Sequence, residues 1–365
     1  MDRRGFLRTS MTLPLATAFA SHPLSARAQP WANGSRWRTF EVTTRVELMQ
    51  PGGTMRVWLP MPLAQDTDYF RTLGNGWSGN AGVLKVARDR KYGTMLLHAE
   101  WSQPNEKPYV ELVSRFATRD RAVDLARPGN NAPADRAELS RYLAPTDLIP
   151  TDGIVRETAR KITKRGGDEV RKARAVYEWV VENTFRDPKT RGCGLGDIRT
   201  MLETGNFGGK CADLNALFVG LCRSLGIPAR DVYGVRVADS QWGYKSLGKS
   251  GDITRAQHCR AEFYSRAHGW VPVDPADVRK VVLEEPPGNL PLEGAKVTLA
   301  REKLFGAWEM NWLAFNYAHD LKLPASSGPA IPFLMYPNGE TATGRKDSLV
   351  PNDFYYEMQA REISV

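Results

Sequence analysis

The chain has 365 residues, of which 42% are hydrophobic, 25% charged and 10% aromatic, with 32 Gly, 24 Pro and a formal net charge of +9. These are globular proportions, and they exclude a disordered chain, a collagen-like repeat and a coiled coil. The length is large for one core and predicts two domains, or one domain with a substantial appendage.

The positive charge does not by itself indicate a nucleic-acid partner. Four arginines and one aspartate in the first 28 residues account for three of the nine charges. The rest of the chain has no block of lysines and no platform of arginines with aromatic residues, which nucleic-acid binding would need. We therefore expect a solvated basic surface and no nucleic acid.

Residues 1–28 are predicted to be an export signal. A basic start precedes the apolar run 11–20, which is too short to cross a bilayer, and residues 26–28 (ARA) have the small-x-small form that signal peptidases cut. Residues 2–8 (DRRGFLR) resemble the twin-arginine export signal of bacteria. We expect cleavage after Ala28, a periplasmic protein, and no membrane insertion once the signal is removed.

Residues 36–125 are predicted to form a β-rich N-terminal domain. Apolar residues alternate with other residues from Phe40 to Leu48 and again over 110–116, which is the period of a strand. Turn residues at 51–53 and 74–76 separate such runs, and this favours a small antiparallel sandwich. Residues 126–150, which begin with a stretch rich in Pro, Asn and Asp, are expected to be a linker.

Helical spacing begins in the segment 151–285. Apolar stripes run over 154–162 and 170–181, and the most regular stripe, 214–225, is closed by Gly226 and broken by Pro228. Strand-like runs follow at 231–237, 258–264 and 270–274, the last two joined by a short turn. The tail, 286–365, is rich in Pro and aromatic residues and is expected to be a mostly irregular extension packed on this domain.

Cys211 is the first candidate for chemistry. It lies between a glycine-rich loop, 208–210, and the start of the most regular helix. Unpaired backbone N–H groups and the positive end of the helix dipole favour a thiolate at that position and can also bind an oxyanion. Cys222, on the apolar stripe of the same helix, is expected to be an inert core residue.

His258 and Asp274 are the second and third candidates. They lie on the two strand-like runs joined by the short turn, and if these pair antiparallel, Asp274 lies beside His258 on one face. The carboxylate would fix the imidazole tautomer, and the imidazole would take the thiol proton and deliver it to a leaving group. The three residues together would form a Cys-His-Asp relay.

Three motifs carry a resemblance to a known family. Residues 209–218 (GKCADLNALF), followed by 226–230 (GIPAR), resemble the first motif of the transglutaminase-like superfamily of papain-fold cysteine enzymes. Residues 258–264 (HCRAEFY) and 269–275 (GWVPVDP) resemble its second and third motifs, in the family's order. The resemblance implies an α+β fold, in which an antiparallel β-sandwich-like domain precedes a catalytic domain over 151–285 whose nucleophile starts a helix packed on an antiparallel sheet.

The resemblance also implies roles and a reaction. Cys211 would be the nucleophile, His258 the general base and then acid, and Asp274 the orienting carboxylate, with no cofactor and no metal. Attack on an amide carbonyl would give a thioester, and we expect water to resolve it, so the expected substrate is a peptide, protein or peptidoglycan-type amide. Transamidation on the same triad and a non-catalytic module that binds peptide or cell wall remain as alternatives.

Residues next to the triad leave further possibilities. The four cysteines could form two disulfides, with Cys193 and Cys259 the first candidates, and pairing with Cys211 would silence the enzyme. Cys193, Cys211, Cys259 and His258 could bind zinc, but no Cys-x-x-Cys or His-x-x-x-His spacing supports this. Arg260 stands where the family usually has an aromatic residue, so we expect a basic cleft lining beside the base.

Overall fold

The computed structural model describes residues 36–49, 53–104, 106–129 and 134–364. The predicted export signal lies outside these residues. None of the described helices has the length and apolar character needed to cross a membrane.

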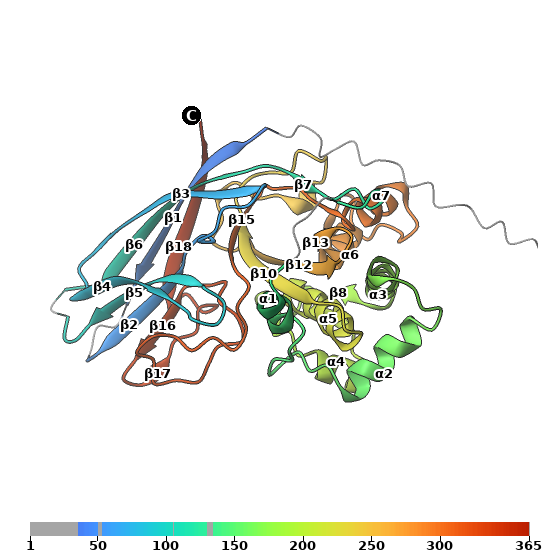
Figure 1. The fold of residues 1–365 in the computed structure, drawn as a ribbon. Helices are drawn as coiled ribbons and strands as arrows, with labels where there is room; N and C mark the ends of the chain where they lie inside the picture. The colour runs from blue at the N-terminus through green and yellow to red at the C-terminus, as the bar shows by residue number, and fades with distance from the viewer. Residues whose placement is uncertain (1–35, 50–52, 105, 130–133, 365) are drawn as a thin grey trace, which may run out of the picture.

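Two five-stranded antiparallel sheets pack face to face as a sandwich (Figure 1). Their strand orders are β11-β18-β1-β6-β3 and β17-β16-β2-β5-β4. Alternating residues of β1 and β6 point into the shared core, where the rings of Phe40 and Phe116 stack with centroids 5.6 Å apart. The strands are β1 (Arg38–Glu47), β2 (Met55–Pro60), β3 (Phe70–Gly79), β4 (Val83–Arg88), β5 (Met95–Trp101), β6 (Tyr109–Thr118), β11 (Gly251–Asp252), β16 (Asn338–Thr341), β17 (Gly344–Arg345) and β18 (Tyr355–Ile363).

A four-stranded antiparallel sheet, in the order β13-β12-β10-β15, lies between the sandwich and a layer of helices (Figure 1). Val232 and Val235 on β10 belong to the sandwich core, and Ala229 and Tyr233 belong to the core under the helices. The elements are α2 (Gly153–Ile162), α3 (Glu169–Asn183), α4 (Ile198–Thr204), α5 (Cys211–Ser224), α6 (Pro275–Glu284), α7 (Ala295–Lys303), β10 (Ala229–Arg236), β12 (Gln257–Ser265), β13 (Gly269–Val273) and β15 (Trp312–Asn316).

Helix α5 is the centre of this half of the molecule. Every residue from Cys211 to Arg223 is buried, because the helix packs on β12 and is covered by the other helices. Gly220 allows the close approach of α4, since a Cβ at that position would stand 2.1 Å from the Cδ1 of Ile198. The nucleophile candidate therefore starts a helix that is buried by its neighbours. The structure confirms the predicted α+β architecture.

Short elements complete the chain. Strand β7 (Arg121–Ala122) pairs with β14 (Ala307–Trp308), and β8 (Phe185–Arg186) pairs in parallel with β9 (Gly208–Gly209). A single 3-10 turn, η1, spans Lys245–Leu247. Helix α1 (Arg136–Arg141) forms within the segment expected to be a linker.

The tail corrects the sequence prediction. Helix α7 packs on α6 of the catalytic half, and β15 completes its sheet, but β16, β17 and β18 belong to the sandwich. Strand β18 pairs with β1 over nine positions, from Thr39 opposite Ile363 to Glu47 opposite Tyr355. The prediction of a mostly irregular extension packed on the catalytic domain is therefore wrong for 338–363. Pairing with β1 supplies the backbone hydrogen bonds that β18 needs, and alternate side chains of β18 are buried.

One buried carboxylate joins several segments of the chain, and we expect its removal to lower the free energy of unfolding. Glu262 on β12 is fully buried, forms an ion pair with Arg121, and accepts a hydrogen bond from Arg230 (2.6 Å), which also binds Glu138 of α1 (2.9 Å). Glu262→Ala should lower the free energy of unfolding by about 3–5 kcal/mol, because two buried guanidinium groups lose their partner. Urea denaturation checks this, with Glu203→Ala on the exposed face of α4 as control. Equal denaturation midpoints for Glu262→Ala and Glu203→Ala would contradict the prediction.

Candidate active site

Cys211 is the first residue of α5. Its side chain is buried, and its backbone N–H makes no hydrogen bond to another described residue. The next amide, of Ala212, donates to the carbonyl oxygen of Cys193 (2.9 Å). The sulfur therefore stands at the positive end of the helix dipole, beside one N–H group free to bind an oxyanion.

The glycine-rich loop before α4 is held tightly against the start of α5. The carboxylate of Asp213 accepts hydrogen bonds from the backbone N–H groups of Leu195 and Gly196 (both 2.9 Å) and of Lys210 (3.0 Å). Gly194 has φ +93°, and a Cβ there would stand 1.8 Å from a carboxylate oxygen of Asp213. Only glycine fits this approach, and it fixes Cys193 beside Cys211.

Three thiols meet at the nucleophile position. All four cysteines are free, and the Cys193 thiol donates a hydrogen bond to the backbone carbonyl oxygen of Gln257 (3.3 Å). The neighbouring Cys193 and Cys259 thiols, together with His258, outweigh burial and lower the pKa of Cys211 well below its usual range. The pKa values of Cys193 and Cys259 are raised in turn. The cluster thus holds one thiolate, and the helix end and the imidazole favour Cys211 as its site.

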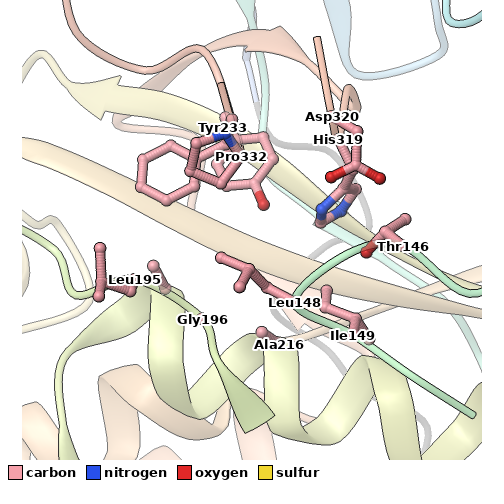
Figure 2. A pocket seen from close by; sticks show the side chains of 12 residues that line it. Thr146, Leu148, Ile149, Leu195, Gly196, Ala216, Tyr233, His319, Asp320 and Pro332 are labelled. Atoms are coloured by element: carbon pink, nitrogen blue, oxygen red, sulfur yellow. The ribbon is translucent and has the colours of Figure 1, made fainter. Parts of the chain in front are cut away.

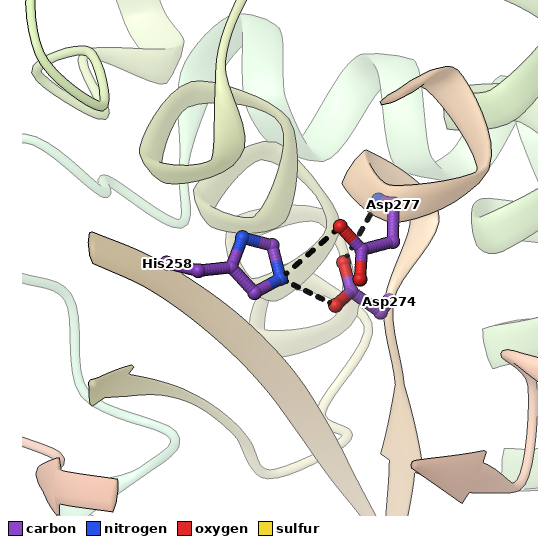
Figure 3. A group of neighbouring side chains, drawn as sticks. All are labelled: His258, Asp274 and Asp277. Carbon is purple, nitrogen blue, oxygen red and sulfur yellow. Dashed lines mark hydrogen bonds and ion pairs between the residues drawn. The ribbon is translucent and has the colours of Figure 1, made fainter. Parts of the chain in front are cut away.

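His258 and Asp274 meet as the antiparallel pairing predicts (Figure 3). The register that sets Ala261 opposite Val273 brings the end of β13 to His258, whose Nε2 lies 2.7 Å from Oδ2 of Asp274. Asp274 is also the N-cap of α6, because its Oδ1 accepts from the Asp277 backbone N–H (3.0 Å). The Asp277 carboxylate, which sequence analysis missed, lies 3.4 Å from the same Nε2.

Two buried guanidinium groups accompany these carboxylates. Nη2 of Arg236 lies 2.5 Å from Oδ1 of Asp277, and Nε of Arg260 lies 3.7 Å from Oδ2 of Asp274. Burial opposes ionisation, but Arg236, His258 and Arg260 hold the pKa of Asp277 well below its usual range. The pKa of His258 is raised, because Asp277 and Asp274 outweigh burial and Arg236. The imidazole is therefore poised to carry a positive charge next to the thiolate.

The same cluster does not fit a metal ion. His258, Asp274 and Asp277 offer ligand atoms within 4.8 Å of one another. However, Arg236 already occupies Oδ1 of Asp277, and Arg260 stands beside Asp274, so two fixed positive charges would oppose a cation. We interpret the group as a base with its orienting carboxylates.

A cleft of about 850 Å³ opens at Cys211 and His258. The tail supplies part of its lining, including Tyr336 and Tyr356, which no local sequence pattern indicated. Arg260 does not line it: the side chain is 2% exposed, and its guanidinium lies 4.8 Å from the ring centre of Trp312. The prediction of a basic lining from Arg260 is therefore wrong, because that side chain points into the core.

A second cavity is too small to be a substrate site. It has a volume of about 10 Å³ and is lined by Ala216 of α5, Leu148, Tyr233 and His319 (Figure 2). Such a space holds about one water molecule. Nε2 of His319 lies 3.2 Å from Oδ2 of Asp231. We interpret this pair as part of the core.

Comparisons with known proteins bear on the family and the fold. Residues 156–275 match the family model of the transglutaminase-like superfamily. An uncharacterised protein of Haemophilus influenzae is 34% identical over 342 residues, which cover 89% of this chain and 91% of the relative. A solved structure described as a candidate cysteine protease, from Cytophaga hutchinsonii, superposes with a TM-score of 0.55 at 14% identity, covering 91% of this chain and 92% of that chain, and so shares the fold. The chain belongs to the transglutaminase-like superfamily.

Proposed function

We propose that the protein is an exported cysteine hydrolase that cleaves an amide or peptide bond through a thioester on Cys211. The observation that carries this proposal is a thiol at the start of a helix that lines one cleft with an imidazole, whose Nε2 lies 2.7 Å from the Asp274 carboxylate. Export rests on the resemblance of residues 2–8 to a twin-arginine signal and on the cleavage motif at 26–28, which would place the protein in the periplasm.

The proposed reaction uses the two ring nitrogens of His258 differently. Nε2 faces Asp274, which leaves Nδ1 to exchange a proton with the substrate. The thiolate of Cys211 attacks the amide carbon, the C–N bond breaks, and the imidazolium gives its proton to the leaving amine. Water then attacks the thioester carbon while the imidazole takes its proton, which releases the carboxylic acid and restores the thiolate.

The character of the cleft favours hydrolysis over transfer. Polar and charged side chains, among them Lys210, Gln257 and Lys249, line it together with the aromatic residues of the tail. Water enters a lining of this kind, and it then competes with any acceptor amine for the thioester. Acyl transfer would need a dry acceptor channel, and a purely binding role would not require the lowered pKa of the Cys211 thiol beside His258.

Alkylation of the thiols tests the proposal. In a brief pulse of iodoacetamide at about pH 6, Cys211 should be labelled at least about 10-fold faster than Cys222, whose pKa is raised by burial. Mass spectrometry of peptides identifies the labelled residue. Labelling occurs at this pH because the lowered pKa of Cys211 keeps the thiolate, while the raised pKa of His258 keeps the imidazolium partner.

The matched control is His258→Gln, which keeps a polar side chain but removes the imidazolium. This variant should lose most of the labelling of Cys211 at about pH 6 and recover it at higher pH, where any thiol ionises. Equal labelling of Cys211 and Cys222 in the native protein would refute the activated nucleophile. Equal labelling of Cys211 in the native protein and in His258→Gln would refute the proposed thiolate–imidazolium pair.

A further inference from the structure

The lining of the active-site cleft carries a strong excess of positive charge. Seven of its residues are Lys or Arg, and two, Asp252 and Glu357, are acidic. Cys211 and His258 line the same cleft as these cations. A cleft lined by one sign of charge focuses its field on the ligand that enters it.

Several of these cations lack full compensation. Arg186 and Lys280 both pair with the single carboxylate of Glu284, the latter at 3.5 Å. Lys210, Lys249 and Arg255 have no carboxylate within the 4.0 Å of an ion pair among the described residues. Hydrogen bonds from Thr254 lower the pKa of Asp252, and the positive charges of Lys249 and Arg255 lower it further without forming an ion pair with it.

Like charges crowd near the nucleophile. Burial lowers the pKa of Lys280, and the neighbouring Arg236 and Arg186 lower it further. Lys210 directly precedes Cys211 and lines the same cleft. An anion in the cleft would relieve this repulsion, whereas a cationic group would increase it.

We propose that the substrate is an acidic peptide, in which carboxylates flank the scissile amide and bind these basic side chains. The proposal rests on the proposed function, because it takes the cleft as the place where the amide meets Cys211. A peptide is favoured over a nucleic acid because a thiolate beside an imidazolium attacks an acyl carbon, and the nucleic-acid backbone offers none. Lys249 and Arg255, both exposed at the cleft, would bind carboxylates away from the reacting atoms.

Equilibrium binding tests the proposal without turnover. The full mature chain carrying Cys211→Ser is titrated with rhodamine-labelled octapeptides, one of alternating Ala and Glu and one of alternating Ala and Gln, and anisotropy gives each Kd. The acidic probe should bind at least about 10-fold more tightly at about 20 mM salt, and this preference should shrink at about 300 mM salt. The double variant Lys249→Gln/Arg255→Gln should lose about fivefold or more of it.

The control double variant is Lys164→Gln/Arg165→Gln, which removes the same charge from exposed residues outside the cleft. It should keep the full preference for the acidic probe. Equal binding of the two peptides would overturn the proposal, as would tighter binding of an oligothymidylate of the same charge. A failure of the proposed function is distinguishable, because it would show as an unreactive Cys211 in a protein that still prefers the acidic probe.

Discussion

Cys211→Ala is expected to abolish acylation of the protein by p-nitrophenyl acetate. The native protein should release one equivalent of p-nitrophenol in a burst and gain the mass of one acetyl group on Cys211. The variant should lose at least about 10³-fold of this rate, because the thiols that remain nearby, Cys193 and Cys259, do not start the helix and burial raises their pKa values. Absorbance during the burst and the intact mass afterwards measure the two quantities.

The fold should survive this change. The sulfur of Cys211 stands at a helix end beside the cleft, and alanine keeps the backbone there, so the free energy of unfolding should change by no more than about 1 kcal/mol. Cys222→Ala is the matched control: it removes a buried thiol from the same helix, away from the cleft, and should leave the burst intact. A burst that persists in Cys211→Ala would exclude Cys211 as the nucleophile.

Local signals predicted the part of the site built from neighbouring segments. The stripe at 214–225 and the break at Gly226-Ile227-Pro228 set the end of α5, and with the glycines before it they set the start at Cys211. The pairing of β12 with β13 follows from two alternating runs and a short turn, so the meeting of His258 and Asp274 was accessible from the sequence. Their catalytic roles stay a prediction.

Other parts of the site depend on contacts between distant segments. Asp277 follows Asp274 by one helical turn, but its bond to Arg236 depends on how α6 sits on β10. Arg260 looks like a cleft residue by its place in the motif, yet the packing of β15 sets Trp312 beneath its guanidinium. Neither contact has a local pattern, because each is fixed by the packing of two elements.

The tail illustrates the same limit. Tyr356, Met358 and Ala360 alternate as buried residues of β18, and this period was present in the sequence. The partner of β18 is β1, more than 300 residues earlier, and a strand's own pattern does not name its partner. As a consequence, the sequence alone could not predict that residues of the tail line the cleft beside Cys211.

Asp274→Asn is expected to slow acylation by p-nitrophenyl acetate by about 10²-fold or more, with the fold intact. In the native protein Oδ2 faces Nε2 of His258, while Oδ1 caps α6 at the Asp277 backbone N–H. An asparagine has one oxygen for these two contacts. Because asparagine caps helices as well as aspartate does, we expect the oxygen to keep the cap and the amide NH₂ to face Nε2, which is the wrong partner for a protonated imidazole.

The pH dependence separates this effect from a merely structural one. Asp277 and Asp274 raise the pKa of His258, so losing the Asp274 charge lowers that pKa. The thiolate–imidazolium pair exists above the pKa of Cys211 and below that of His258, so the alkaline limb of the acylation profile should move to lower pH in Asp274→Asn. Asp252→Asn, in the same cleft but without contact to His258, should leave the limb in place. An unmoved limb in Asp274→Asn would mean that Asp277 alone sets the charge of the imidazole, and that Asp274 serves only as the cap of α6.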